Sequence, residues 1–506
     1  MVIGYTRLIP KGAGNKPPAG DATAGTHAAP QVRRGAPQGA GKQFSRHRIW
    51  EASLAALVTL GVLWVILYAQ PAKVRHRHVL VISIDGMRSD TYLRPLPGLH
   101  IPNLLRLKQQ GSFADGMIVV YPSLTYPSHT TMMTGKLPAQ HGIYTNLSSR
   151  VPGKDAKDWF WFSHAIRCPT VWDVARRHGL TTASIGWPVT AGADINWDVP
   201  EIWNPAIGRV PEPMYVAKFM NPIFALQALG AVGLPKANED DDDLRIALAR
   251  YVIQEHQPNL MLIHLVDLDA MQHQYGPGSP QAVQVLNSED HRIGEILAAY
   301  QKAGLGKNTD VFIVSDHGFV KVHRIILPNK LFVKAGLLSA DAHGNITGGR
   351  IDTVSNDGSF FIYWPPHRHL GRAVYRAILP LLERHLVWAV LGRNALKALG
   401  ADPNARLALD APSGAMFDSS AKGPLVSSCP TKGSHGYLPF RPGLEASFIA
   451  WGPGIKSGVD LHLIRETSIA STILKALGII DPKFGDTPPL QDIWKRPAAR
   501  PHHPHA

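Results

Sequence analysis

The sequence contains little cysteine and little charge for its length. Cys168 and Cys429 are its only cysteines in 506 residues, which excludes a disulfide-rich scaffold and any zinc module built on four cysteines. One disulfide between them stays open. Charged residues make up 18% and hydrophobic residues 45%, which excludes a wholly disordered chain, a coiled coil and a collagen-like fibre. No internal repeat is present. The length fits about three domains, or one large α/β domain with insertions.

The net charge of +14 is concentrated near the start of the chain. Residues 1–49 hold eight Lys/Arg against one acid, Asp21. From Lys11 to Lys42, 19 of 32 residues are Gly, Ala or Pro. Such a segment cannot bury enough apolar surface to offset the entropy lost on ordering. We therefore expect residues 1–49 to be a disordered basic segment, and residues 496–506 to be a disordered tail.

An uncharged apolar run lies between this basic segment and the rest of the chain. Ala52–Ala69 has 18 residues without a charge, with Trp50, Trp64 and Tyr68 near its ends. A helix of that length is about 27 Å long, and residues 50–70 are therefore predicted to form a transmembrane helix or signal anchor. Two alternatives are a cleaved signal peptide, which would give a secreted protein, and a buried core helix.

The charges on either side of this helix predict its orientation. Eight Lys/Arg precede it and three follow closely, which favours a cytoplasmic N-terminus and an extracytoplasmic remainder, periplasmic in a Gram-negative bacterium. The positive charge is then explained by membrane topology, and no specific nucleic-acid binding is expected. Residues 74–495 are predicted to form the main folded domain.

Short apolar runs alternate with amphipathic segments through residues 74–495. Val79–Ile84, Leu260–Val266 and Val311–Ser315 are continuous apolar runs, as is typical of strands buried on both faces. Helical patterns such as Pro102–Gln110 lie between them. The pattern predicts an α/β fold, in which a mainly parallel sheet carries helices on both faces.

Acidic residues and histidines follow the predicted strands. Functional residues of open α/β sheets gather at the carboxyl ends of strands. Each of these residues alone is more often a helix cap, but Asp and His together are the ligand types that zinc prefers without cysteine. Six of them suffice for two four-coordinate zinc ions, with one position on each left for a nucleophile or substrate. The candidates are Asp85, Asp267, Asp269, His273, Asp316, His317 and His435.

The candidate nucleophile lies in the segment Tyr121–Gly135. Thr125 comes shortly before Pro127, which can open a helix that runs to Thr134. A threonine there faces a helix N-terminus, where backbone N–H groups favour an anion, although a simple N-cap hydroxyl is a common role. Ser123 and Ser128 are alternative nucleophiles, and composition does not choose among the three.

Several motifs occur in a specific order: IDG, TYPSH, TG, HGIYTN, D-x3-H-xx-GP, SDHGF and HGY. This order resembles the nucleotide pyrophosphatase/phosphodiesterase (type I phosphodiesterase) family of the alkaline phosphatase superfamily, over about residues 79–480. The resemblance implies a doubly wound sheet with cap-like insertions at about 190–240 and 320–430. It also implies a ligand set for two zinc ions: Asp85, Asp316, His317 and Thr125 for one, and Asp269, His273 and His435 for the other.

Two further roles are implied by the same resemblance. Asn146 matches the residue that hydrogen-bonds a phosphoryl oxygen, and Tyr126 matches an aromatic residue that can stack on a nucleobase. Ser128 and Gln272 depart from the family pattern, which usually has Asn and Gly there. Neither departure removes a ligand, but both touch the pocket.

The resemblance implies a zinc-dependent hydrolase of phosphodiester or pyrophosphate bonds, acting on small nucleotide-like substrates through a phosphothreonine intermediate. A phosphomonoesterase, a membrane-anchored phosphoethanolamine-type transferase and a sulfatase are the alternative enzymes. A non-catalytic surface binding protein is the alternative of another class, but it should have lost at least one ligand, and none is lost.

Overall fold

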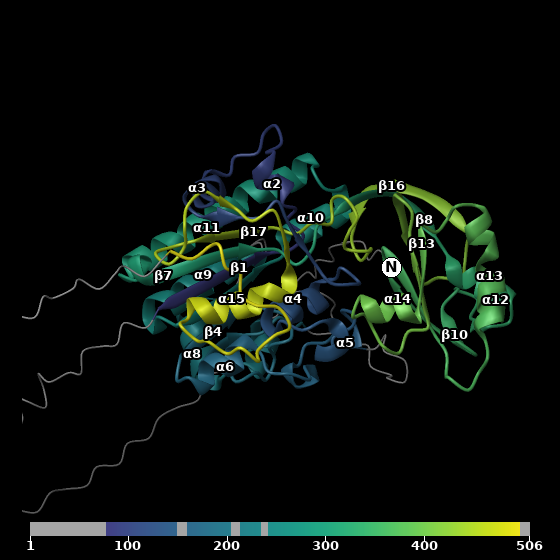
Figure 1. The fold of residues 1–506 in the computed structure, drawn as a ribbon, viewed down its shortest axis with the longest axis horizontal. Helices are drawn as coiled ribbons and strands as arrows, with labels where there is room; N and C mark the ends of the chain where they lie inside the picture. Colours follow the sequence, from purple (N-terminus) through teal and green to yellow (C-terminus); the bar gives the residue numbers. More distant parts are fainter. Residues whose placement is uncertain (1–76, 149–158, 204–212, 234–240, 496–506) are drawn as a thin grey trace, which may run out of the picture. The chain divides into compact units, whose positions relative to one another are not determined.

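The computed structural model describes residues 77–148, 159–203, 213–233 and 241–495 (Figure 1). The predicted basic segment 1–49, the predicted membrane helix 50–70 and the predicted tail 496–506 lie outside these residues. Within the described ranges, no helix combines the length and the apolar character needed to cross a bilayer. Cys168 and Cys429 are not joined to each other, so the disulfide that the sequence left open is not formed.

A central eight-stranded sheet organises the described residues. The strands β7, β1, β6, β4 and β5 are mutually parallel, whereas β17 is antiparallel to β7 and β2. The α/β fold with a mainly parallel central sheet is therefore confirmed. In spatial order the strands are β18 (Val459–Asp460), β2 (Ser112–Phe113), β17 (Phe448–Trp451), β7 (Thr309–Val314), β1 (His78–Ile84), β6 (Leu260–Leu265), β4 (Thr182–Ile185) and β5 (Trp197–Val199).

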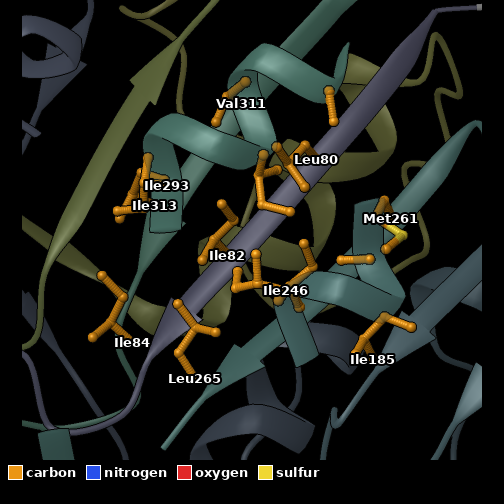
Figure 2. Close-up of a cluster of buried hydrophobic side chains, with 14 of the residues drawn as sticks. Leu80, Ile82, Ile84, Ile185, Ile246, Met261, Leu265, Ile293, Val311 and Ile313 are labelled. Carbon is orange, nitrogen blue, oxygen red and sulfur yellow. The ribbon is translucent and has the colours of Figure 1, made fainter. Parts of the chain in front are cut away.

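Strand β1 is buried on both faces because helices cover both sides of the sheet. Its side chains alternate: Leu80, Ile82 and Ile84 enter one hydrophobic cluster, shown in Figure 2, and Val79 and Val81 enter the other. The first cluster contains residues of α2 (Asp90–Leu93), α3 (Pro102–Gln110), α8 (Pro222–Val232), α9 (Asp241–His256), α10 (Asp267–Tyr275) and α11 (Pro280–Lys302). The second contains residues of α4 (Thr125–Thr134), α6 (Val171–Arg177) and α15 (Ile469–Ala476).

The predicted insertion at 320–430 forms smaller antiparallel and mixed sheets with a core of their own. One sheet has the order β11 (Asp352–Asn356), β12 (Ser359–Tyr363), β14 (Leu407–Asp410) and β13 (Ala389–Gly392). Another has the order β15 (Gly414–Phe417), β8 (Val320–Ile326) and β16 (Val426–Ser434), and a hairpin joins β9 (Leu338–Ala340) to β10 (Ile346–Gly349). The helices here are α12 (Pro328–Lys334), α13 (Gly371–Glu383) and α14 (Arg393–Ala398).

The remaining elements are short. Strand β3 (Gly116–Ile118) pairs with β19 (Leu463–Arg465), and the helices are α5 (Pro138–His141) and α7 (Pro213–Val216). Single 3-10 turns lie at Ser163–Ala165, Ala217–Phe219, Gly306–Asn308 and Glu466–Ser468. The functional consequence of the fold is that β1, β6 and β7 lie side by side and end at one edge of the central sheet.

Candidate metal centre

The first cluster of candidate ligands comprises Asp85, Asp316 and His317. Asp85 follows β1, and Asp316 and His317 follow the neighbouring parallel strand β7. His317 Nε2 lies 3.3 Å from Asp85 Oδ1 and 3.2 Å from Asp316 Oδ2. All three residues are buried, and one ligand atom of each lies within 4.8 Å of the others. The carboxyl edge of the sheet thus brings Asp85 close to Asp316 and His317, which lie 231 and 232 positions later in the sequence.

The second cluster comprises Asp269, His273 and His435. Asp269 and His273 lie one turn apart in α10, which follows β6, and His435 follows β16 of the insertion. Asp269 Oδ1 lies 3.5 Å from His273 Nε2 and 3.8 Å from His435 Nε2, and the two Nε2 atoms are 3.2 Å apart. The rings of His435 and His317 stack with their centroids 3.7 Å apart, so the two clusters are adjacent.

Three carboxylate oxygens of these clusters are available to bind cations. Asp85 Oδ1, Asp316 Oδ2 and Asp269 Oδ1 are buried and have no hydrogen-bond partner. A buried carboxylate oxygen without a partner is costly unless a cation binds it. Burial raises the pKa of Asp85 well above its usual value, and the charges of Asp316 and Asp269 raise it further. Oxygen and imidazole ligands in these numbers suit zinc, and the clusters can hold two such ions.

Outer hydrogen bonds orient the ligands. His435 Nδ1 donates to the carbonyl of Ser123 at 2.9 Å, and His317 Nδ1 donates to the carbonyl of Gly318 at 3.2 Å. Each bond leaves the Nε2 lone pair free for a metal. The backbone N–H of Gly86 donates to Asp316 Oδ1 at 3.1 Å, which leaves Oδ2 as the ligand atom. These contacts preorganise both clusters for coordination.

Thr125 is the hydroxyl that lies at the first cluster. It is the first residue of α4, and its Oγ1 is 3.5 Å from His317 Nε2. The N-cap residue of this helix, Leu124, makes no side-chain hydrogen bond to it. Ser123 is fully buried, and its hydroxyl already donates to Tyr437 and accepts from Gly436. Ser128 is fully buried one turn further along α4. Of the three candidate hydroxyls, the structure places that of Thr125 beside His317 of the first cluster.

Asn146 and Tyr126 are connected to each other. Asn146 Oδ1 accepts a hydrogen bond from the Tyr126 backbone N–H at 3.0 Å, so the Asn146 NH₂ group is the part that can donate to a phosphoryl oxygen. The Tyr126 ring has 0% exposure, its hydroxyl donates to Glu201, and Trp159 packs against it at 5.2 Å. The expectation that Tyr126 stacks on a nucleobase therefore needs correction: its ring is covered, and the half-buried Trp159 lies over it.

Residues that the sequence did not single out complete the site. His264, in β6, lies between Asp85 and Glu201, with Nε2 at 3.2 Å from Asp85 Oδ2 and Nδ1 at 2.8 Å from Glu201 Oε2. Burial lowers the pKa of His264, but Glu201 and Asp85 together outweigh burial and raise it to about 10. A histidine inside the apolar run LMLIHL was the available signal. No comparable local pattern marks Glu201.

Helix α10 also supplies a contact to the first cluster. Gln272 Nε2 donates to the carbonyl of Gly86 at 2.9 Å, so this departure from the family pattern ties α10 to the loop after Asp85. Gly86 has φ +69°, and a Cβ there would lie 2.8 Å from the Phe319 ring, which requires glycine. Asp267 instead pairs with Arg292 at 3.1 Å, so Asp269 is the acid of this segment that reaches the second cluster.

The fold and the site define a class: an α/β protein whose sheet edge carries two adjacent Asp/His clusters beside a threonine at a helix N-terminus. The family model "Type I phosphodiesterase / nucleotide pyrophosphatase" matches residues 79–437. The chain belongs to this family. The resemblance of the ordered motifs is thereby confirmed.

Individual relatives are more distant. Ectonucleotide pyrophosphatase/phosphodiesterase family member 1 is 24% identical in Mus musculus over 452 residues and 25% identical in Homo sapiens over 450, covering 86% of this chain and 44% of each relative. The chain thus spans less than half the length of these curated relatives. Venom phosphodiesterase 2 of Crotalus adamanteus is 25% identical over 260 residues, which are 50% of this chain and 28% of that protein.

Solved structures support the fold. An inactive variant of murine ectonucleotide pyrophosphatase/phosphodiesterase 5 in complex with AMP has a TM-score of 0.58 and 19% identity, covering 80% of this chain and 96% of that one. The human protein 5 has a TM-score of 0.58 and 20% identity, covering 81% and 97%. The similarity extends over nearly the whole of each solved chain.

Proposed function

We propose that the protein is a zinc-dependent hydrolase of phosphodiester or pyrophosphate bonds, acting on small nucleotide-like substrates with Thr125 as the nucleophile. One observation carries the proposal: the Thr125 hydroxyl lies at the first of two adjacent ligand clusters, in which one oxygen of each carboxylate has no hydrogen-bond partner. Family membership supports the reaction class, and the names of the relatives describe pyrophosphatases and phosphodiesterases.

Zinc bound at the clusters would supply Lewis-acid chemistry, lowering the pKa of a coordinated hydroxyl and neutralising charge on phosphoryl oxygens. The residues of this chain do the positioning. Thr125 is held at the N-terminus of α4, where the helix dipole favours an anion. Thr125 Oγ1 loses its proton to solvent and forms a bond to phosphorus as the first leaving oxygen departs. Water then cleaves the phosphothreonine and returns a proton to Oγ1. Two inversions at phosphorus give net retention.

Asn146 stabilises the charge on the phosphoryl group during both displacements. Its carbonyl oxygen is held by the Tyr126 backbone N–H, which aligns the amide with the start of α4. An amide NH₂ that is already oriented donates to a developing negative charge without the cost of reorganisation. Asn146 is partly exposed, as a residue that contacts substrate must be.

The charge of the site favours a diester over a monoester. A monoester carries about one more negative charge at pH 8, and a bidentate arginine is its natural partner. The segment Tyr121–Gly135 contains no Arg or Lys. In the described part of the chain, the ion pairs of Asp85, Asp269 and Asp316 are with histidines alone. A singly charged phosphodiester suits such a site.

The test is the ratio of two hydrolysis rates by the zinc-loaded full chain. We expect kcat/KM for bis-p-nitrophenyl phosphate to exceed that for p-nitrophenyl phosphate by at least about tenfold, which requires only about 1.4 kcal/mol of discrimination. A preference for the monoester would assign the protein to the monoesterases. Transfer of the phosphoryl-linked group to an alcohol acceptor in place of water would favour the transferase.

We also propose that the catalytic unit lies outside the cytoplasm, anchored by residues 50–70. The eight-to-three Lys/Arg bias supports this topology, and the names of the relatives describe ectoenzymes. A reporter that is active only outside the cytoplasm, fused after residue 76, should be active in cells. An active cytoplasmic reporter at the same junction would show the opposite orientation, and a shortened mature chain released from the membrane would show signal cleavage.

A further inference from the structure

We propose that Glu201 and His264 act as a positioning pair, which holds the ligand carboxylate of Asp85 and couples it through Tyr126 to the start of helix α4. This inference rests on the proposed two-zinc function of the site. It assigns a role to residues that lie behind the metal ligands and that touch neither the substrate nor the nucleophile.

A continuous hydrogen-bond path links these residues. The Asp85 Oδ2 atom lies 3.2 Å from His264 Nε2, and His264 Nδ1 lies 2.8 Å from Glu201 Oε2. The other oxygen of Glu201 accepts from the Tyr126 hydroxyl at 3.1 Å. The path therefore begins at the end of β1, passes through β6, and reaches the second residue of α4.

The path decides which Asp85 oxygen is available to a metal. Because Oδ2 is occupied by His264, Oδ1 is left without a partner, and it lies 3.3 Å from His317 Nε2. A carboxylate held at one oxygen cannot rotate freely about its terminal bond. His264 thus orients Asp85 toward the other ligands of the first cluster, as outer-shell partners of metal ligands do.

The far end of the path lies at the groups expected to contact phosphate. Tyr126 follows Thr125 directly, and its backbone N–H donates to the Asn146 side chain at 3.0 Å. One residue therefore connects Glu201 to both the nucleophile and the phosphoryl-binding amide. A shift at Glu201 would move Asp85 and Tyr126 together.

The burial of the pair distinguishes it from ordinary core packing. His264 has 0% exposure inside a central strand whose other residues are apolar, and Glu201 is also buried, near Arg245 at 3.6 Å. Buried ionic groups are often replaceable by apolar residues at no loss of stability. A buried carboxylate–histidine–carboxylate row that ends on a metal ligand is instead explained by its effect on that ligand.

The test measures zinc affinity together with activity. The variants are Glu201→Gln, His264→Gln and Tyr126→Phe, and Asp290→Asn is the matched control. Asp290 is a buried carboxylate outside the site that accepts from the Leu104 backbone N–H at 2.7 Å. Zinc affinity is measured by chelator competition in an Asp269→Ala background, where only the first cluster keeps all its ligands. Co²⁺ absorption in the same background reports the ligand geometry.

We expect Glu201→Gln and His264→Gln each to lower zinc affinity of the first cluster by about 10- to 100-fold and to alter the Co²⁺ spectrum. Tyr126→Phe should have a smaller effect, mainly on kcat. The double variant Glu201→Gln/His264→Gln should lose no more affinity than the worse single variant, because both act through Asp85. If His264→Gln does not fold, the zinc affinities and activities of Glu201→Gln and Tyr126→Phe still test the positioning role.

Three results would overturn the pairing. The first is a folded Glu201→Gln protein with unchanged zinc affinity and Co²⁺ spectrum. The second is a loss no larger than that of Asp290→Asn, and the third is additive losses in the double variant. A parent chain that binds no zinc would overturn the proposed function as well, so the two failures are distinguishable.

Discussion

The first cluster, Asp85 with Asp316 and His317, and the second, Asp269 with His273 and His435, use the same two residue types in different surroundings. The side chains of the first cluster are at most 5% exposed, whereas those of Asp269 and His273 are 15% and 35% exposed. The first cluster is built at the ends of two central strands. The second joins one helical turn to a strand of the insertion.

This difference concerns how each cluster is supported. In the first, Asp85 and Asp316 each use one oxygen in a hydrogen bond to a neighbouring element. In the second, His435 has such a bond, to Ser123, whereas Asp269 Oδ1 has no hydrogen-bond partner among the described residues and lies 3.5 Å from His273 and 3.8 Å from His435. A more buried and better-supported cluster should bind metal more tightly and release it more slowly. The two clusters can therefore be distinguished experimentally by their metal affinities and release rates.

The largest expected effect is at the residue that contacts the first cluster alone. Thr125→Ala should abolish turnover while both clusters keep their Asp and His ligands, and Thr125→Ser should retain part of it, because a serine hydroxyl can still reach His317 and the metal. Steady-state hydrolysis and zinc content per chain check this. Ser128→Ala is the matched control on the same helix. Normal turnover by Thr125→Ala with loss in Ser123→Ala or Ser128→Ala would show another hydroxyl to be the nucleophile.

Removing one carboxylate from one cluster at a time should show what each cluster contributes to activity and to zinc content. Asp316→Ala and Asp269→Ala should each lower kcat/KM by at least about a thousandfold, because metal ions supply several kcal/mol of transition-state stabilisation. Each variant should lose about one of two zinc ions, measured by elemental analysis. Two zinc ions and full activity in Asp316→Ala would contradict the assignment of the first cluster.

Chelation should distinguish the clusters without a mutation. We expect the more exposed second cluster to release its zinc first, at a chelator concentration about tenfold lower than the first, since outer-shell support is worth about that much in affinity. Zinc release and activity are followed in the same titration. Release of both ions in one step would show that the clusters bind metal as one unit.

The smallest expected effect is on the free energy of unfolding, through a buried histidine, His141, that contacts α4. Burial lowers the pKa of His141 from 6.5 to about 3, and its ring holds Thr131 of α4 at 3.0 Å. The pKa of His141 in the folded state lies below its pKa in the unfolded state. The contribution of neutral His141 to the free energy of unfolding is therefore complete above about pH 6.5 and decreases as pH falls toward about 3. At pH 5 the loss is up to about 2 kcal/mol.

Urea unfolding at pH 7.5 and pH 5.0, with a chelator present so that metal release does not contribute, measures this loss. His141→Gln should show a smaller decrease in the free energy of unfolding between the two pH values than the parent chain. An equal decrease in both proteins would assign the acid sensitivity to other groups.

Much of the site could be predicted because parallel strands bring their carboxyl ends together. Asp85 comes directly after one strand and Asp316 one residue after the end of another, so a pattern of burial along the sequence indicates where they meet. Asp269 and His273 are four residues apart, which places them on one face of a helix. These placements follow from local periodicity.

Other residues required the folded structure. His435 reaches the second cluster because β16 runs antiparallel to β8 and returns the chain to the residues after His317. Tyr126 could not be recognised as a buried residue, because its cover comes from Trp159 and its hydroxyl partner is Glu201. Those neighbours are 33 and 75 residues away, and no local pattern connects them.

The sequence by itself determined the α/β class, the family and the ligand types, because burial periodicity and short ordered motifs are local properties of a chain. Only the tertiary structure decided which oxygen of each carboxylate is free, which hydroxyl lies at the first cluster, and how His264 and Glu201 support Asp85. The physical reason is that hydrogen bonds act over about 3 Å, so they depend on side-chain packing between elements distant in sequence.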